Sequence, residues 1–206
     1  MIDFASNIFH IKLILKDFFI VLASGSRYRA ELLARLGLPF QAWSPAVDES
    51  PLPGESCAQT AARLARRKAE AALERFPGAW IIGSDQVAEL DGRPIGKPGD
   101  RDNARRQLAA MRGRSVVFHT ALCLLAHGRA QEALVPTRVA FRDLSDAEIE
   151  RYLDREPAFD CAGSAKSEAL GISLLASLSG DDPTALVGLP LIALAGMLRR
   201  EGASVP

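Results

Sequence analysis

The stretch VLASGSRYRAELLARLG, residues Val21 to Gly37, joins an apolar run to a leucine-rich one through a serine-rich turn. The run Phe18 to Ala23 is β-branched and aromatic, which is typical of a buried strand. From Arg29 to Leu36 the leucines recur at helical spacing, and Gly37 closes the segment. The stretch therefore predicts a strand, a tight turn and a helix.

The turn itself has the composition of an anion site. Ser24 to Ser26 would present backbone N–H groups and hydroxyls at a helix N-terminus, where the helix dipole favours negative charge. Arg29 would add a charge-assisted contact, and phosphate is the obvious ligand. A serine helix cap followed by solvated arginines explains the turn equally well. No GxxxxGK[ST] loop occurs in the chain.

The rest of the chain alternates helical and strand patterns. Further helices are expected at Cys57–Arg75, Asp102–Arg112, Ser145–Asp154 and Pro190–Arg200. Strands are expected at Phe40–Trp43, Trp80–Gly83, Val87–Leu90, Ser115–Leu125 and Ala133–Phe141, with a hairpin turn at Asp91-Gly92. This alternation predicts an α/β fold, with flanking helices on a mixed β-sheet bent into two lobes around a central cleft.

Length and composition predict an ordinary globular protein. At 206 residues and 48% apolar content the chain can bury a core, which we expect to be a single domain over residues 18–206 after an N-terminal extension, residues 1–17. Charged residues in the extension interrupt any membrane-length apolar run. Lys plus Arg number 25, as do Asp plus Glu. The chain therefore has no net charge that would favour binding to nucleic acid or to a membrane surface. The three cysteines are dispersed, which predicts reduced thiols and a cytoplasmic protein without a zinc site.

Four further charged residues stand at element ends, in loops or on a helix. Asp85 follows a predicted strand, where a carboxylate can hold a divalent cation or take a proton from water, although a turn aspartate is the simpler explanation. Glu49 lies in a loop and Lys68 on a helix face, where solvated charges are common. Lys97 lies between Gly96 and Pro98, which stiffen and expose the backbone around its ammonium group. Together with the serine turn and Arg29, these four residues form the set needed to hydrolyse a phosphoanhydride.

With these residues in view, the chain resembles the Maf family of nucleoside triphosphate pyrophosphatases from about Ile20 to Gly202. The resemblance is carried by LASGSRYRAELLARLG, VDES, RLARRKA, IIGSDQVAELDGRPIGKP, FRDLSDAEIERYL, CAGSAKSEALG and LVGLPLIAL. It implies the two-lobed mixed sheet of Maf and ITPase-like proteins. It also implies cleavage between the α- and β-phosphates with a divalent metal, Mg²⁺ or Mn²⁺.

The resemblance also implies roles for individual residues. Asp85 matches the catalytic acid of the family, as general base or water-orienting carboxylate, and with Glu49 it would hold the metal. Ser24, Arg29, Lys68 and Lys97 match the phosphate-binding positions.

Three positions depart from the branch of the family that resembles dTTP and UTP pyrophosphatases. That branch carries Arg, Thr and Gln where this chain has Tyr28, Gln86 and Glu168, so the set resembles the branch that acts on 7-methyl-GTP. Methylation at N7 gives guanine a positive charge, which an aromatic face at Tyr28 would attract, by roughly 0.5–2 kcal/mol. Glu168 would accept from N1–H and the exocyclic amine. Without the family resemblance, the preferred explanation of Tyr28 is ordinary packing on a helix, and that of Glu168 is an acid on a surface loop.

The expected function is thus hydrolysis of 7-methyl-GTP, a house-cleaning step that removes modified nucleotides. One alternative is the same chemistry on dTTP, UTP or other non-standard triphosphates. Another is a nucleotide-binding regulator of septum formation with little turnover. The expected partner is a small-molecule nucleotide, with a homodimer left open.

Overall fold

The computed structural model describes residues 18–205, so the expected extension at residues 1–17 lies outside the described residues. Within them a seven-stranded mixed sheet has the order β2-β1-β3-β5-β6-β7, with β4 also paired to β3. β1 is parallel to β2 and β3, and the other pairings are antiparallel. The predicted α/β fold on a mixed sheet is confirmed.

The elements follow the sequence pattern closely. The strands are β1 (Ile20–Ala23), β2 (Phe40–Ala42), β3 (Trp80–Leu90), β4 (Arg93–Ile95), β5 (Ser115–Ala126), β6 (Arg129–Phe141) and β7 (Leu175–Gly180). The α-helices are α2 (Arg27–Ala34), α3 (Cys57–Arg75), α4 (Arg101–Met111), α5 (Asp146–Arg155) and α6 (Leu191–Arg200). Short 3₁₀ turns occur at Ala162–Ser164 and Leu170–Leu174.

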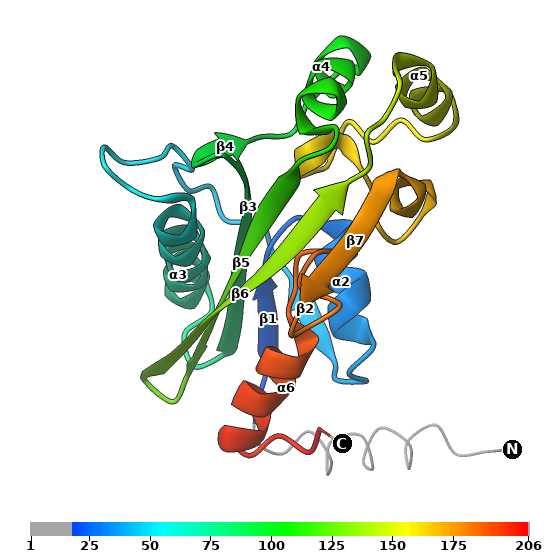
Figure 1. Cartoon of the computed structure of the whole chain (residues 1–206). Helices are drawn as coiled ribbons and strands as arrows, with labels where there is room; N and C mark the ends of the chain where they lie inside the picture. Colours follow the sequence, from blue (N-terminus) through cyan, green and yellow to red (C-terminus); the bar gives the residue numbers. More distant parts are fainter. Residues whose placement is uncertain (1–17, 206) are drawn as a thin grey trace, which may run out of the picture.

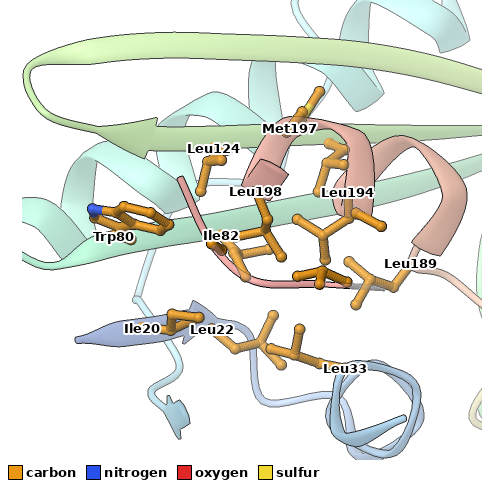
Figure 2. Packing of buried hydrophobic residues seen from close by; sticks show 14 of the residues in the cluster. Ile20, Leu22, Leu33, Trp80, Ile82, Leu124, Leu189, Leu194, Met197 and Leu198 are labelled. Carbon is orange, nitrogen blue, oxygen red and sulfur yellow. The ribbon is translucent and has the colours of Figure 1, made fainter. Parts of the chain in front are cut away.

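Alternating side chains of β1 pack into two hydrophobic cores on opposite faces of the sheet. Ile20 and Leu22 pack with α2 and α6, whereas Val21 and Ala23 pack with the alanine-rich face of α3. Figure 2 shows the first of these cores, with Leu33 and Leu198 approaching the strands from α2 and α6. Complete burial on both faces explains why the β1 segment is uniformly apolar.

A third core lies at the other end of the long strands. There α4 and α5 pack over residues such as Val116 and Phe141 of β5 and β6. Figure 1 shows α4 and α5 at one end of the sheet and α3, α2 and α6 towards the other. The continuous strands β3, β5 and β6 run through both parts, which gives the molecule its two lobes.

The sequence patterns were wrong in three details. The two predicted segments 80–83 and 87–90 form one continuous strand, β3. β6 begins at Arg129, before the predicted Ala133, because its pairing with β5 extends to the turn. β7 was not predicted, since its exposed sequence LASLSG becomes a strand only by pairing at the edge with β6.

Two further expectations concern the thiols and the membrane. In the part of the chain that the structure describes, Cys57, Cys123 and Cys161 are free. Over those same residues no helix has both the length and the apolar character required to span a bilayer.

Candidate active site

An ion pair between β3 and α3 forms the buried centre of the site. Lys68 Nζ donates to Asp85 Oδ1 at 2.6 Å, and each residue is only 7% exposed. Burial raises the pKa of the Asp85 carboxyl, against the opposing charges of Lys68 and Arg29. A carboxylate so placed is a strong proton acceptor that a neighbouring cation keeps ionised.

Gly83 brings the two elements of this ion pair together. A Cβ on Gly83 would lie 2.1 Å from the backbone oxygen of Ala65 and 2.9 Å from the Ala69 Cβ. Only a residue without a side chain therefore allows α3 to pack this closely on β3. The close packing places Lys68, which follows Ala65 by about one turn and adjoins Ala69, against Asp85.

Glu49 reaches the same ammonium group from the loop before α3. Lys68 Nζ lies 2.6 Å from Glu49 Oε1. Partial burial acts to raise the pKa of Glu49, but contact with Lys68 and the charges of Lys97 and Arg29 lower it overall. The structure thus brings Glu49 and Asp85 together around one cation.

These two carboxylates fit the divalent metal that the family resemblance implies. Their oxygens share one ammonium contact, and Mg²⁺ commonly binds through one or two carboxylates completed by substrate phosphates. Within residues 18–205 no group of three or more His, Cys, Asp or Glu side chains has the arrangement of a complete protein-only metal site. The arrangement suits a cation held jointly by protein and nucleotide.

The serine turn after β1 caps α2 and holds Arg29 in place. Ser26 caps α2 by accepting from the Arg29 backbone N–H at 3.4 Å. The buried Ser24 hydroxyl accepts from Arg29 Nη1 at 3.3 Å and from the Ser26 backbone N–H at 3.1 Å. Burial lowers the pKa of Arg29, although Asp85 and Glu49 act to raise it. Arg29 is consequently a positioned cation rather than a solvated one.

Gly188, in the LVGLPLIAL motif, is a site residue that the sequence reasoning missed. Its backbone oxygen accepts from Arg29 Nε at 2.9 Å and from the Ser84 hydroxyl at 3.0 Å. Its φ of +117° favours glycine, and a Cβ there would meet Arg29 Nε at 3.4 Å. The motif had been identified, but nothing in it indicated a contact with a residue so distant in the chain.

Two adjoining cavities surround these residues, in the cleft between the lobes. The first, about 420 Å³, is lined by the serine turn, Tyr28, Lys97 and Asp160 among others. The second, about 450 Å³, is lined by Asp85, Gln86 and the segment 94–97. Both include Arg29, Glu49, Lys68 and Lys97 in their walls. Their sizes are those of small-ligand sites.

The predicted specificity residues occupy three different settings. Tyr28 lines the first cavity, and its hydroxyl donates to Asp160 Oδ2 at 3.0 Å. Gln86 lines the second, and its Nε2 donates to Thr120 Oγ1 and to the backbone oxygens of Ala185 and Leu186, which holds that loop to β3. Glu168 lies in an exposed turn outside the walls of both cavities.

Asp160 is the second site residue that the sequence reasoning missed. Besides Tyr28, it binds Lys166, whose Nζ lies 3.1 Å from Asp160 Oδ1. The Arg27 guanidinium stands 4.7 Å from the centroid of the Tyr28 ring, and Lys166 Nζ stands 5.7 Å from it. A second charged cluster thus lines the cavity that contains Glu49 and Lys68.

The family model and the curated relatives that this chain matches agree with one another. A family model described as Maf-like protein matches residues 19–201. A 7-methyl-GTP pyrophosphatase of Methylobacillus flagellatus is 57% identical over 188 residues, 90% of this chain and 98% of that protein. Another, from Aromatoleum aromaticum, is 59% identical over 189 residues, 91% of this chain and 97% of that protein. The solved structure of the Staphylococcus aureus Ham1 protein has a TM-score of 0.44 at 17% identity, covering 60% of this chain and 72% of that chain.

Proposed function

Because the chain belongs to the Maf family, we propose that it is a nucleoside triphosphate pyrophosphatase whose preferred substrate is 7-methyl-GTP. Water attacks the α-phosphorus, the bond to the α–β bridging oxygen breaks, and the products are 7-methyl-GMP and diphosphate. The observation that carries the chemistry is the buried Asp85–Lys68 pair in a cleft that also presents Arg29 and Ser24.

The triphosphate is held by positive charge and by the serine turn. In this proposal Ser24 and Arg29 bind phosphoryl oxygens at the N-terminus of α2, where the helix dipole adds to the attraction. Lys68 and Lys97, which stand in the walls of both cavities, neutralise further negative charge. Such preorganised charges stabilise the transition state of phosphoryl transfer.

Asp85 accepts a proton from the attacking water. Its burial raises the pKa, which strengthens it as a base, while Lys68 keeps the carboxylate ionised. A divalent cation, Mg²⁺ or Mn²⁺, would be held by Asp85 and Glu49 and would neutralise charge on the phosphates.

Preference for the methylated base is assigned to Tyr28, Gln86 and Glu168. Tyr28 supplies an aromatic face to the cationic ring from the wall of the first cavity. Gln86 supports the selection by holding the loop at residues 185–186. Glu168 reaches the base only if its exposed turn moves towards the cavity. The cellular role is removal of modified nucleotides in the cytoplasm.

The test is diphosphate release from 7-methyl-GTP, GTP, dTTP and UTP with Mg²⁺ or Mn²⁺, with Asp85→Asn as the matched control. We expect a clear preference for 7-methyl-GTP and a loss of at least about 1000-fold in Asp85→Asn, because the base is absent. Nucleotide should still raise the melting temperature of the variant. Preference for dTTP or UTP would retain the chemistry and refute the specificity, whereas no release from any triphosphate would favour the binding-protein alternative.

A further inference from the structure

The mechanism leaves one carboxylate in the first cavity without a role. Among the described residues that line this cavity, only Glu49 and Asp160 are acidic. Glu49 is bound to Lys68 at the catalytic centre. Asp160 belongs instead to the cluster around Tyr28, so it is the acid available to the part of a ligand beyond the phosphates.

Asp160 retains unused hydrogen-bonding capacity. Its Oδ2 accepts from the Tyr28 hydroxyl at 3.0 Å and its Oδ1 contacts Lys166 Nζ at 3.1 Å. Arg27 Nη2 also lies 3.8 Å from Oδ2. Because a carboxylate offers about four acceptor positions and two accept short contacts, about two remain for a ligand that displaces Arg27. The Asp160 side chain is 51% exposed, which leaves it accessible to a ligand in the cavity.

The charge state of Asp160 is also held in place. Partial burial acts to raise its pKa, but the hydrogen bonds from Lys166 and Tyr28 outweigh burial and lower it. The group is therefore ionised at neutral pH. The same two contacts fix the carboxylate beside the Tyr28 ring.

An aromatic ring next to a fixed carboxylate matches the chemistry of a cationic purine. The positive ring would lie against Tyr28, while N1–H and the exocyclic amine would both find acceptors on one carboxylate. Arg27 already lies over the same ring, and its side chain is exposed, so a base stacked there would displace this guanidinium. A neutral pyrimidine, with one ring N–H donor and no positive charge, would gain less from this pair.

We propose that Asp160 is a specificity-determining residue that accepts hydrogen bonds from the guanine edge of 7-methyl-GTP and attracts its positive charge. This inference rests on the proposed function. It adds an acidic base-recognition group in the cavity wall itself, whereas Glu168 lies outside both cavity walls.

The test compares Asp160→Asn with Asp143→Asn, two matched removals of one negative charge, because Asp143 is exposed and lies outside the walls of both cavities. For each we would measure kcat/KM for 7-methyl-GTP, GTP and UTP. Asp160→Asn should lower the ratio of 7-methyl-GTP to UTP at least tenfold. The ratio of 7-methyl-GTP to GTP should fall less, because GTP keeps the same donors and lacks only the charge. Asp143→Asn should change either ratio less than threefold.

Comparison of Asp160→Asn with a double variant shows whether Asp160 contacts the base directly or only neutralises the charge of Lys166. In Asp160→Asn the ammonium of Lys166 loses its partner and would itself repel a cationic base. The double variant Asp160→Asn with Lys166→Met removes that repulsion. The ratios should stay low in the double variant, and recovery of the wild-type ratios would overturn the proposed contact.

The outcomes distinguish failure of this inference from failure of the function. No preference for 7-methyl-GTP in the wild-type protein would refute the proposed function itself. A wild-type preference that survives in Asp160→Asn, or an equal loss for every substrate, would refute only the role of Asp160. If Asp160→Asn does not fold, Asp160→Glu applies the same test, since it keeps the charge but moves the carboxylate by one methylene and should lower the ratio severalfold.

Discussion

Two charged clusters line one cleft, and they differ in how firmly the fold holds them. Asp85 and Lys68 stand on β3 and α3, each 7% exposed and packed through Gly83. Tyr28 and Asp160 stand on the first turn of a short helix and on a loop, and the Asp160 side chain is 51% exposed. The group assigned to chemistry is thus built on rigid elements, and the groups assigned to base selection are built on accessible ones.

This difference has a physical basis. Phosphates are common to all nucleoside triphosphates, so a buried and preorganised charge set can serve every substrate. Bases differ at their edges, and a change in an exposed loop residue costs little folding energy. Changes at the buried cluster should therefore affect every substrate, whereas changes at the exposed cluster should alter the ranking of substrates.

Removing the ammonium of the buried pair should have the largest effect. Lys68→Met should lower kcat by about 100-fold for every triphosphate, because a transition-state charge contact is lost. Lys68 also lowers the pKa of Asp85, so its removal should raise that pKa further above the ordinary value. Since the base must be ionised, the acidic limb of kcat/KM should move to higher pH, which a pH–rate profile would measure.

Lys97→Met is the matched control, because it removes the same charge from an exposed position in the cleft. It should weaken phosphate binding but leave the acidic limb at its wild-type pH. If the acidic limb of kcat/KM moved equally in both variants, the loss of the Lys68–Asp85 pair would not be the cause of the displacement.

Adding a methyl group where β3 and α3 pack closely should have the next largest effect. Gly83→Ala places a methyl group against the Ala65 backbone oxygen and should lower the free energy of unfolding by about 1–3 kcal/mol. Denaturant titration would measure it. Gly96→Ala, where a Cβ meets no atom within 4 Å, should change that free energy by less than about 0.5 kcal/mol. Equal stability of the two variants would show that the sheet and helix are not tightly coupled.

The smallest effect is expected at the exposed cluster. Tyr28→Phe keeps the ring but loses the hydroxyl bond to Asp160, which is worth roughly 0.5–1.5 kcal/mol. The ratio of kcat/KM for 7-methyl-GTP to UTP should fall about three- to tenfold, with stability nearly unchanged. Tyr28→Leu should reduce the ratio further because the aromatic face is lost as well. A uniform loss for all substrates would place Tyr28 with the phosphate-binding groups instead.

Much of the fold was predictable because the local patterns agree with the tertiary structure. The helix Cys57–Arg75 matches its predicted bounds, with Ser56 and Gln59 forming a capping box at its start. Ser145 and Glu148 form a capping box at the start of α5, and the hydrogen bonds from Ser145, together with that from Arg142, lower the pKa of Glu148 to about 2. β7 was missed because no local pattern marks an edge strand that only its neighbour stabilises.

The sequence by itself determined most of the elements and their order, the serine-rich turn after β1 and the set of charged residues, because these depend on local spacing and residue chemistry. Only the tertiary structure decided which charges meet. Asp160 bonds Tyr28 across 132 positions, and Gly188 bonds Arg29 across 159. Such contacts arise from packing α2 and the C-terminal loops against one sheet, and no periodicity in the chain encodes them. The same packing joined Lys68 to Asp85 and left Glu168 outside the cavity walls.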